Sequence, residues 1–418
     1  MKNEDQLLRL TCLTGDKECG PQEESVRLAS GVQDWDRFLQ KADFHRLLPR
    51  TYLLLKNGGA DSFLRPQIWK KIEEAHLMAQ FRVLALEAEL IKNLLPRFNQ
   101  EGVEVLLLKG AALQQNVYRK KPIRSFVDLD LMIHEKDLSK ASKILEGEGY
   151  QRRLSHFPSQ WHAREFGIEA GEIAFPYWQG EREIKLDLHV DAFERWSPFR
   201  FTRNWLWENA KPITVGVSEA LVPEPNRLFL HLLFHLLKHV QAHENILGWY
   251  LDLTECLCYF EKEIDGSFCL RAVQSNSGEN QILEILDFLD RELNAPLPPE
   301  FRPLIERKRI KTLSWENILD PIQPSELAGF NQSEGTDRRE LFLFYWKQVR
   351  GLRKKLIFLL RWLVPDPGYL KVKYPFRNTW DKCLAYGRHL TVMALKGVSL
   401  GFYWLRRERA GSHAARRI

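Results

Sequence analysis

The segment that most constrains the fold is SFVDLDLMI, residues 125–133, in which Asp128 and Asp130 alternate with apolar residues. A period of two predicts a β-strand and places both carboxylates on the same face. Like charges so close together repel each other, and Asp is uncommon in strands. Two explanations follow from the residues: a solvated sheet face, or a divalent cation bound between the two carboxylates.

A second segment with the same alternation lies downstream. In REIKLDLHV, residues 182–190, Asp187 and His189 fall on one face and apolar residues on the other. His189 is predicted to orient the carboxylate of Asp187 or to contact phosphate, rather than to act as a general base. The polar faces of the two acidic strands are expected to bring together three carboxylates, those of Asp128, Asp130 and Asp187.

Residues suited to phosphate binding precede the first acidic strand. Lys109 and Gly110 lie where a buried strand, VEVLLLKG (103–110), is predicted to end and a short helix, AALQQNVY (111–118), to begin. A helix start offers free backbone N–H groups and a favourable dipole to phosphate, and glycine lets phosphate approach the backbone closely. Arg124 is placed to add a charge-assisted contact. Because Mg²⁺ prefers oxygen ligands and often binds carboxylates together with substrate phosphates, this pattern predicts phosphate chemistry.

These motifs resemble a known family. The segments are LLLKGAALQQNVY (106–118), IRSFVDLDLMIHEKDL (123–138) and IKLDLHVDAF (184–193). Together they are similar to the nucleotidyltransferases of the DNA polymerase β-like superfamily. More narrowly, they resemble its bacterial, largely uncharacterised group with a Lys-Gly motif, an Arg before Asp-x-Asp and a later Asp-Leu-His strand. The flanking stretch 228–257 is similar in a looser way.

The resemblance implies an α+β fold, in which a small mixed, palm-like sheet is flanked by N-terminal and C-terminal helical regions. It implies two catalytic Mg²⁺ ions, with Mn²⁺ as the alternative, for which Asp128 and Asp130 are the first ligands. Asp187 is the third carboxylate, which ligates the catalytic ion and helps to activate an acceptor hydroxyl. The implied reaction moves a nucleoside monophosphate from an NTP, ATP by default, to an acceptor and releases pyrophosphate. Many superfamily members carry Gly-Ser where this chain has Lys109-Gly110, so their mode of triphosphate binding does not transfer directly.

The pattern along the chain predicts four parts. Helical periodicity dominates before the acidic strands, above all from Ile68 to Phe98, and returns from about 226 to 290. The strands at 172–178 and 182–190 are predicted to pair as a hairpin, and Pro176 favours the edge of the sheet. The predicted parts are an N-terminal helical region (1–99), a nucleotidyltransferase catalytic domain (100–195), a helical domain (196–344) and a basic C-terminal region with a disordered end (345–418).

A run of histidines follows the catalytic segment at four-residue steps, at His231, His235, His239 and His243. Neighbouring pairs are adjacent on a helix, but successive steps drift around it, so all four cannot converge on one ion. A zinc pair is one interpretation. Histidines that line the cleft beside the catalytic domain are the favoured one. We expect Asp252 to be an N-terminal helix partner or to form an inter-domain bond, rather than to act as a fourth metal ligand.

Charge is distributed unevenly. The net charge is +6, but residues 345–418 contain 17 Lys and Arg against three Asp and Glu. Such a basic, aromatic-rich segment suits an anionic membrane surface or a partner protein. The six scattered cysteines and the absence of a long apolar N-terminal run favour a cytoplasmic protein, at most associated with a membrane.

The acceptor is not predicted: a protein, peptide, sugar or small molecule suits the motifs, and RNA is less favoured because no RNA-binding motif is found. The alternative function is a catalytically inactive nucleotide-binding or adaptor module that docks a partner through its basic C-terminus.

Overall fold

The structure is a computed structural model of the whole chain. It describes residues 2–13, 22–118, 123–150, 172–179, 182–193, 198–241, 244–308, 310, 313–319, 351–367, 370, 374 and 378–393. Backbone contacts divide the chain into two compact units. Nearly all the described residues up to Leu319 belong to the first unit, and those from Gly351 onward belong to the second. The four-part division given above remains a prediction.

The N-terminal region is helical, as predicted. Its segments are α1 (Asn3–Leu13), α2 (Gln22–Ser30), α3 (Trp35–Phe44), α4 (Leu48–Asn57), α5 (Ala60–Phe63), α6 (Pro66–Glu89), the π-helix η1 (Leu90–Leu94) and α7 (Leu95–Gln100). The predicted helix 68–98 therefore has an irregular turn, in which Leu95 N–H donates to the carbonyl of Leu90, five residues back. Pro96 follows directly, and because proline has no N–H and crowds the preceding turn, it favours such an irregularity.

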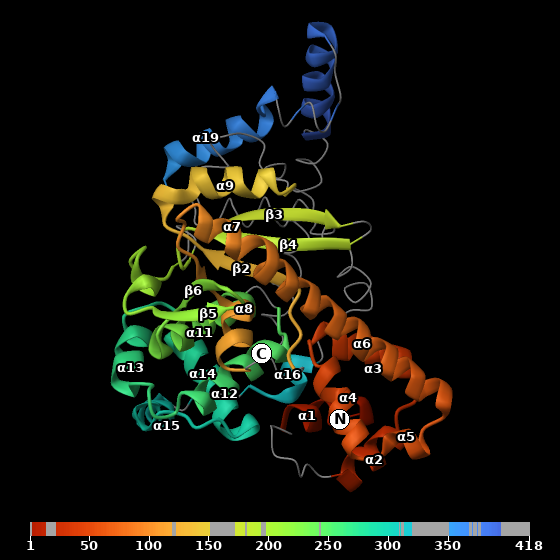
Figure 1. Cartoon of the computed structure of the whole chain (residues 1–418). Helices are drawn as coiled ribbons and strands as arrows, with labels where there is room; N and C mark the ends of the chain where they lie inside the picture. The colour runs from red at the N-terminus through yellow and green to blue at the C-terminus, as the bar shows by residue number, and fades with distance from the viewer. Residues whose placement is uncertain are drawn as a thin grey trace, which may run out of the picture. The chain divides into compact units, whose positions relative to one another are not determined.

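A six-stranded mixed sheet forms the centre of the first unit (Figure 1). Its strands are β1 (Leu106–Leu107), β2 (Asp128–Met132), β3 (Glu172–Gln179), β4 (Arg182–His189), β5 (Lys211–Val215) and β6 (Ser218–Val222), in the order β3-β4-β2-β1-β6-β5. Strand β2 is parallel to β4 and antiparallel to β1, and β1 is parallel to β6. The α+β fold is confirmed, and β3 lies at the sheet edge that Pro176 indicates.

Alternation fixes the orientation of the two acidic strands. Leu129 pairs with Leu186 and Leu131 with Leu188, and all four side chains are fully buried. Burial of a leucine side chain contributes about 1.5–3 kcal/mol, so a one-residue slip of either strand, which would move its two leucines to the opposite face, is strongly disfavoured. The apolar residues thus determine which face presents the carboxylates.

The strand predicted at 103–110 is shorter than expected. Only Leu106–Leu107 forms strand β1, and helix α8 (Lys109–Asn116) begins at Lys109 rather than after Gly110. Leu108 N–H donates to the carbonyl of Asp130 at 3.0 Å, after which the backbone of Lys109 adopts a left-handed φ of 42°. This turn ends the strand and places Lys109 and Gly110 in the first turn of a helix.

A second hairpin, β5–β6, completes the sheet and was not predicted from the sequence. Its turn contains Gly216, whose φ of 66° is the left-handed conformation that glycine adopts without strain. Val217 beside it is 94% exposed. Strand β6 then pairs with β1, and so positions the chain for the helices that follow.

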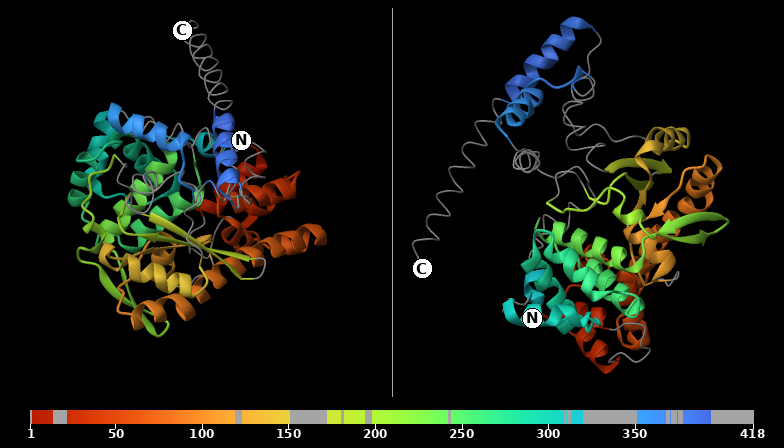
Figure 2. Two further views of the ribbon diagram at one scale, coloured as in Figure 1. Left: turned by 90° about the horizontal axis from the view of Figure 1, so that it is seen from above. Right: turned by 90° about the vertical axis from the view of Figure 1, so that its left-hand side faces the viewer.

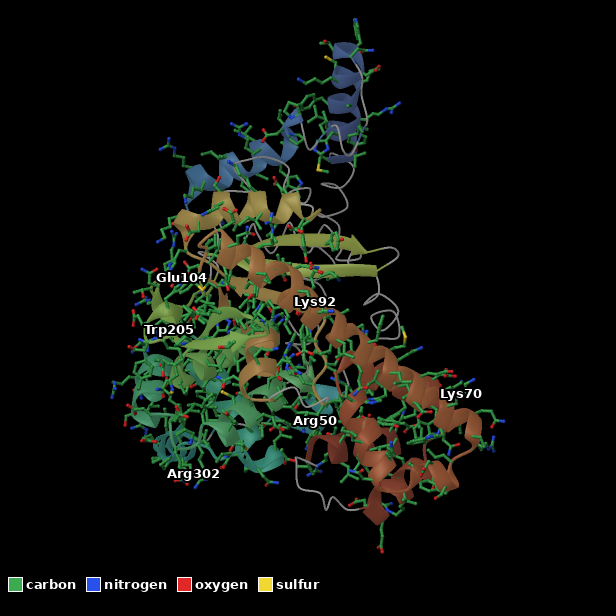
Figure 3. The ribbon with its side chains drawn as sticks, in the orientation of Figure 1. Arg50, Lys70, Lys92, Glu104, Trp205 and Arg302 are labelled. Atoms are coloured by element: carbon green, nitrogen blue, oxygen red, sulfur yellow. The ribbon has the colours of Figure 1, made fainter. Side chains whose placement is uncertain are left out.

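Helices pack around the sheet and behind it. They are η2 (Glu135–Asp137), α9 (Leu138–Gly147), η4 (Trp205–Trp207), α11 (Pro225–Gln241), α12 (Leu247–Tyr259), α13 (Gly266–Gln274), α14 (Glu279–Leu293), η5 (Pro299–Phe301), α15 (Arg302–Lys308) and α16 (Trp315–Leu319). Helices α12, α14 and α16 lie beside the N-terminal helices (Figures 1 and 2). Arg9 pairs with Glu292 at 3.0 Å, and Arg50 pairs with Glu255. Arg50 lies on the inner side of the N-terminal helices, whereas Lys70 is exposed on their outer side (Figure 3).

The second unit contains helix α19 (Leu352–Leu363) and a helix over 379–393. The predicted disordered end lies outside the described residues. In the part of the chain that the structure describes, no helix has both the length and the apolar character needed to cross a bilayer.

Candidate active site

The parallel register of β2 and β4 brings the predicted carboxylates together. Asp130 is the direct partner of Asp187, and Asp128 precedes Asp130 by two residues on the same face. Asp130 is buried, whereas Asp128 and Asp187 are half-buried. Met132 pairs with His189, so His189 also belongs to this face. Three carboxylates and an imidazole therefore share one face of two neighbouring strands, which we call the acidic face.

Lys109 and His189 hold Asp130. Lys109 Nζ lies 2.7 Å and His189 Nε2 lies 2.9 Å from the same oxygen, Oδ1 of Asp130. Burial alone would raise the pKa of Asp130, but the charge of Lys109, with the charge and hydrogen bond of His189, holds it well below its usual range. Asp130 is therefore an anion whose charge is balanced within the site.

Asp128 is in a different electrostatic environment. Burial raises its pKa first, and the negative charge of Asp130 raises it further, against the attraction of Arg46, Lys109 and Arg124. Asp130 is thus negatively charged, whereas Asp128 loses its proton less readily than an ordinary aspartate. Additional positive charge at the acidic face would favour the ionised form of Asp128.

The local backbone explains why Gly110 follows Lys109. A Cβ at position 110 would lie 2.9 Å from Nη1 of Arg124 and 3.1 Å from the side chain of Phe126. Any larger residue would push against that guanidinium, so glycine is needed for packing as well as for the predicted approach of phosphate. Leu108, the N-cap residue of α8, has no polar side-chain atom, so its side chain does not cap the backbone N–H groups of the first turn.

Arg124 is held firmly by helix α12. Its Nε and Nη2 donate to the two oxygens of Asp252, each at 2.7 Å, and Tyr118 Oη donates to Asp252 Oδ1 at 2.9 Å. Asp252 thus forms the expected bond between regions. Arg124 Nη1 is buried and has no hydrogen-bond partner among the described residues. Nη1 of this otherwise fixed guanidinium is therefore available to donate a hydrogen bond to another group.

Sequence reasoning missed Arg46, which lies in the turn between α3 and α4. Its guanidinium stacks over the ring of Trp249, with 5.3 Å between Cζ and the ring centroid. Burial lowers the pKa of Arg46, and the strongest opposing influence is the negative charge of Asp128. A single arginine in a helical region has no motif around it, so only the three-dimensional arrangement associates it with the acidic face.

The histidine run lies on α11. His231 is 1% exposed, and neither ring nitrogen has a hydrogen-bond partner among the described residues. Burial, and next the charge of Lys109, lower the pKa values of both His231 and His235. His239 Nδ1 lies 2.6 Å from Glu244, and its ring packs on Trp249 at 4.2 Å between centroids. The lowered pKa values favour the neutral forms of His231 and His235, whereas His243 lies outside the described residues.

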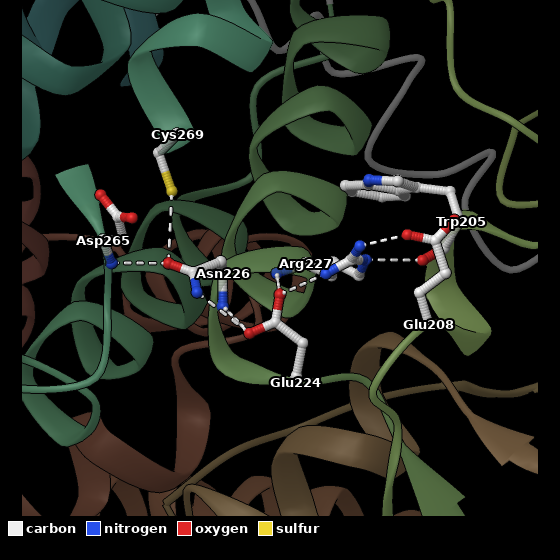
Figure 4. A network of polar contacts seen from close by, with 7 residues as sticks. All are labelled: Trp205, Glu208, Glu224, Asn226, Arg227, Asp265 and Cys269. Atoms are coloured by element: carbon white, nitrogen blue, oxygen red, sulfur yellow. Dashed lines mark hydrogen bonds and ion pairs between the residues drawn. The ribbon is translucent and has the colours of Figure 1, made fainter. Parts of the chain in front are cut away.

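A polar network fixes the start of α11 (Figure 4). Glu224 accepts from the backbone N–H groups of Asn226 and Arg227, both at 3.1 Å, which satisfies two free donors of the helix N-terminus. Arg227 Nε donates to the carbonyl of Trp205 at 2.7 Å, and Asn226 Oδ1 accepts from the N–H of Asp265 at 2.6 Å. The network anchors α11, and with it the positions of its histidines.

Comparison with known protein families finds one match, over residues 31–291. This stretch contains the whole sheet, the acidic face, Arg46 and helix α12. The match defines the chain as an enzyme of the nucleotidyltransferase type. Its family is described as uncharacterised nucleotidyltransferase, and because the match covers more than half of the chain, the chain belongs to that family. The predicted resemblance to an uncharacterised nucleotidyltransferase family is confirmed. No match is found among curated proteins.

Proposed function

We propose that this enzyme transfers a nucleoside monophosphate from an NTP, ATP by default, to an acceptor. An acceptor oxygen forms a bond to the α-phosphorus, the bond from that phosphorus to the bridging oxygen breaks, and pyrophosphate leaves while the acceptor loses its proton. The observation that supports the proposal most is the register of Asp130 with Asp187, which gathers three carboxylates beside Lys109.

We propose Mg²⁺, or Mn²⁺, as the cofactor, held by Asp128, Asp130 and Asp187. Among the described residues, no group of three or more His, Cys, Asp and Glu side chains is arranged closely enough to hold a metal ion. The donor chemistry nevertheless fits, because carboxylate oxygens are the ligands this ion prefers, and the mutual repulsion of Asp128 and Asp130 is relieved by a cation. When bound, such an ion stabilises negative charge on the attacking and leaving oxygens.

The chain's own residues have distinct roles in this proposal. Lys109 and the backbone N–H groups at the start of α8 bind phosphate oxygens, aided by Nη1 of Arg124. Asp187 orients the acceptor hydroxyl and accepts its proton at a carboxylate oxygen. His189 maintains the orientation of Asp130 through its 2.9 Å contact.

The acceptor belongs to one of the classes that the motifs allow: a protein, a peptide, a sugar or a small molecule. The basic C-terminal region, by contacting a partner protein or an anionic membrane, would bring the enzyme near its acceptor. The exposed Leu352 and Leu356 on the basic helix α19 support a contact of this kind.

NTP binding tests the proposal without knowledge of the acceptor. Each NTP is titrated into the protein with and without Mg²⁺ while the melting temperature is followed, and the titration is repeated with the Asp128→Ala/Asp130→Ala variant. Ligand that binds the folded state raises the melting temperature by mass action. We expect a Mg²⁺-dependent rise that the folded variant lacks. No rise with any NTP in folded wild-type protein would instead favour the inactive adaptor module.

A further inference from the structure

Helix α12 gathers three arginines that come from separate parts of the chain. Trp249, Asp252 and Glu255 follow one another at three-residue steps, so they lie along one side of the helix. Asp252 binds Arg124, Glu255 binds Arg50, and the ring of Trp249 lies under Arg46. A small pocket in this region is lined by Arg46, Arg50, Tyr118, Arg124, Gly248 and Asp252. We call it the arginine pocket.

The three arginines differ in how their charge is balanced. Arg50 and Arg124 each pair with a buried or half-buried carboxylate of α12. Among the described residues, Arg46 has no hydrogen bond or ion pair from its guanidinium and rests only on an aromatic ring. A half-buried guanidinium without a hydrogen-bonded carboxylate gains from binding another anion. Arg46 is thus the arginine of this pocket that is best placed to bind an anionic ligand.

The backbone holds Arg46 in an unusual conformation. Its φ is 61°, in the left-handed region that side-chain-bearing residues rarely adopt. The preceding residue, His45, fixes the turn: its carbonyl accepts from Gly248 N–H at 3.0 Å and its Nδ1 accepts from Leu247 N–H at 3.3 Å. A Cβ on Gly248 would lie 3.0 Å from both the His45 carbonyl and Arg46 Cβ. Strain that surrounding contacts enforce in this way is typical of functional positions.

Arg124, which also lines the arginine pocket, carries a second unused donor. Arg124 Nη1 is buried and without a hydrogen-bond partner among the described residues, although the other nitrogens of that guanidinium are bound. Arg124 and Ser125, which both line the arginine pocket, lead directly into the acidic strand β2. The pocket therefore combines two available arginine donors next to the residues that bear Asp128.

We propose that Arg46, together with Nη1 of Arg124, binds the β- and γ-phosphates of the nucleoside triphosphate. This inference rests on the proposed function, because it assigns a binding place to the leaving pyrophosphate. Terminal phosphates carry most of the negative charge of an NTP, and a planar guanidinium matches their oxygens well. The N-terminal helical region thereby completes the active site, in keeping with a family match that begins before Arg46.

Binding measurements that separate the phosphates test this assignment. ATP, AMP and inorganic tripolyphosphate are titrated calorimetrically, with Mg²⁺, into wild-type protein, Arg46→Gln and Arg37→Gln. Arg37→Gln is the matched control, because Arg37 is exposed on α3 in the same helical region. We expect Arg46→Gln to weaken ATP and tripolyphosphate binding about tenfold or more, the usual effect of losing a charged hydrogen bond. AMP binding should stay within about twofold, and Arg37→Gln should leave all three affinities unchanged.

A second variant keeps the test valid if Arg46→Gln fails to fold. Arg46→Gly removes the side chain and also relieves the left-handed backbone, so it should fold even if Arg46→Gln does not, and it should show the same selective loss. Unchanged ATP affinity in a folded Arg46 variant overturns the inference while the proposed function stands. An equal loss for AMP and ATP also overturns it, since Arg46 then acts on the α-phosphate or on the fold. Wild-type protein that binds neither tripolyphosphate nor any NTP refutes the proposed function and this inference together.

Discussion

Replacement of Asp252 by Asn tests how strongly helix α12 holds the active-site arginine. Asp252 is 3% exposed, and it accepts two hydrogen bonds from Arg124 and one from Tyr118. Asparagine keeps the shape but loses the charge and one acceptor, and its NH₂ group faces a guanidinium that can only donate. Loss of one partner from a buried ion pair costs about 3–5 kcal/mol, because the remaining charge stays buried. Since the amide retains one acceptor, we expect about 3 kcal/mol for Asp252→Asn.

The assay is urea denaturation of wild type, Asp252→Asn and the matched control Asp36→Asn. Asp36 pairs with Lys71 at 2.8 Å, but the side chains of Asp36 and Lys71 are 67% and 50% exposed. Solvent screens an exposed pair, so its loss should change the free energy of unfolding by less than about 1 kcal/mol. Equal losses for the two variants would refute the reasoning, since burial would then make no difference. A loss at Asp252 should also weaken NTP binding, because Arg124 is no longer fixed.

Two further substitutions give sharp expectations. Gly110→Ala places a methyl group against Arg124 and should weaken NTP binding about tenfold by calorimetry, whereas Gly147→Ala, with nothing within 4 Å of the added carbon, should leave binding unchanged. Burial lowers the pKa of His45 from 6.5 to about 3, so below pH 6.5 the unfolded chain takes up a proton that the folded chain does not. Stability should therefore fall as the pH falls from 6.5 toward 3, by about 2 kcal/mol at pH 5 for this group. His45→Asn should lack this contribution when unfolding free energies are compared at pH 7 and pH 5.

The acidic strands were predictable because their information is local. A period of two defines the face of a strand from a few residues, and four buried leucines enforce the register once the strands pair. The pairing of Asp130 with Asp187 follows from the two patterns together. The predicted edge position of β3 likewise follows from one residue, Pro176, which cannot donate to a neighbouring strand.

Other features depend on contacts between distant segments, which a sequence pattern does not contain. Arg46 joins the site only because His45 binds the start of α12, some 200 residues later in the chain. The strand around Leu106 ends early because the chain turns at Lys109, which favours neither a turn nor a left-handed backbone by residue type. The β5–β6 hairpin had a local signal, because Gly216 follows the β-branched run Ile213, Thr214 and Val215, although Ser218–Val222 has little β-branched character.

Transfer of labelled nucleotide tests the central claim most directly. The protein is incubated with Mg²⁺, a cell extract as the source of acceptors, and ATP labelled at either the α- or the γ-phosphate. Asp128→Asn, shown to be folded, is run in parallel. We predict that an acceptor gains label from α-labelled but not γ-labelled ATP, and that Asp128→Asn abolishes this gain. Label gained from the γ position alone, or equal α-label in the variant, would contradict the account.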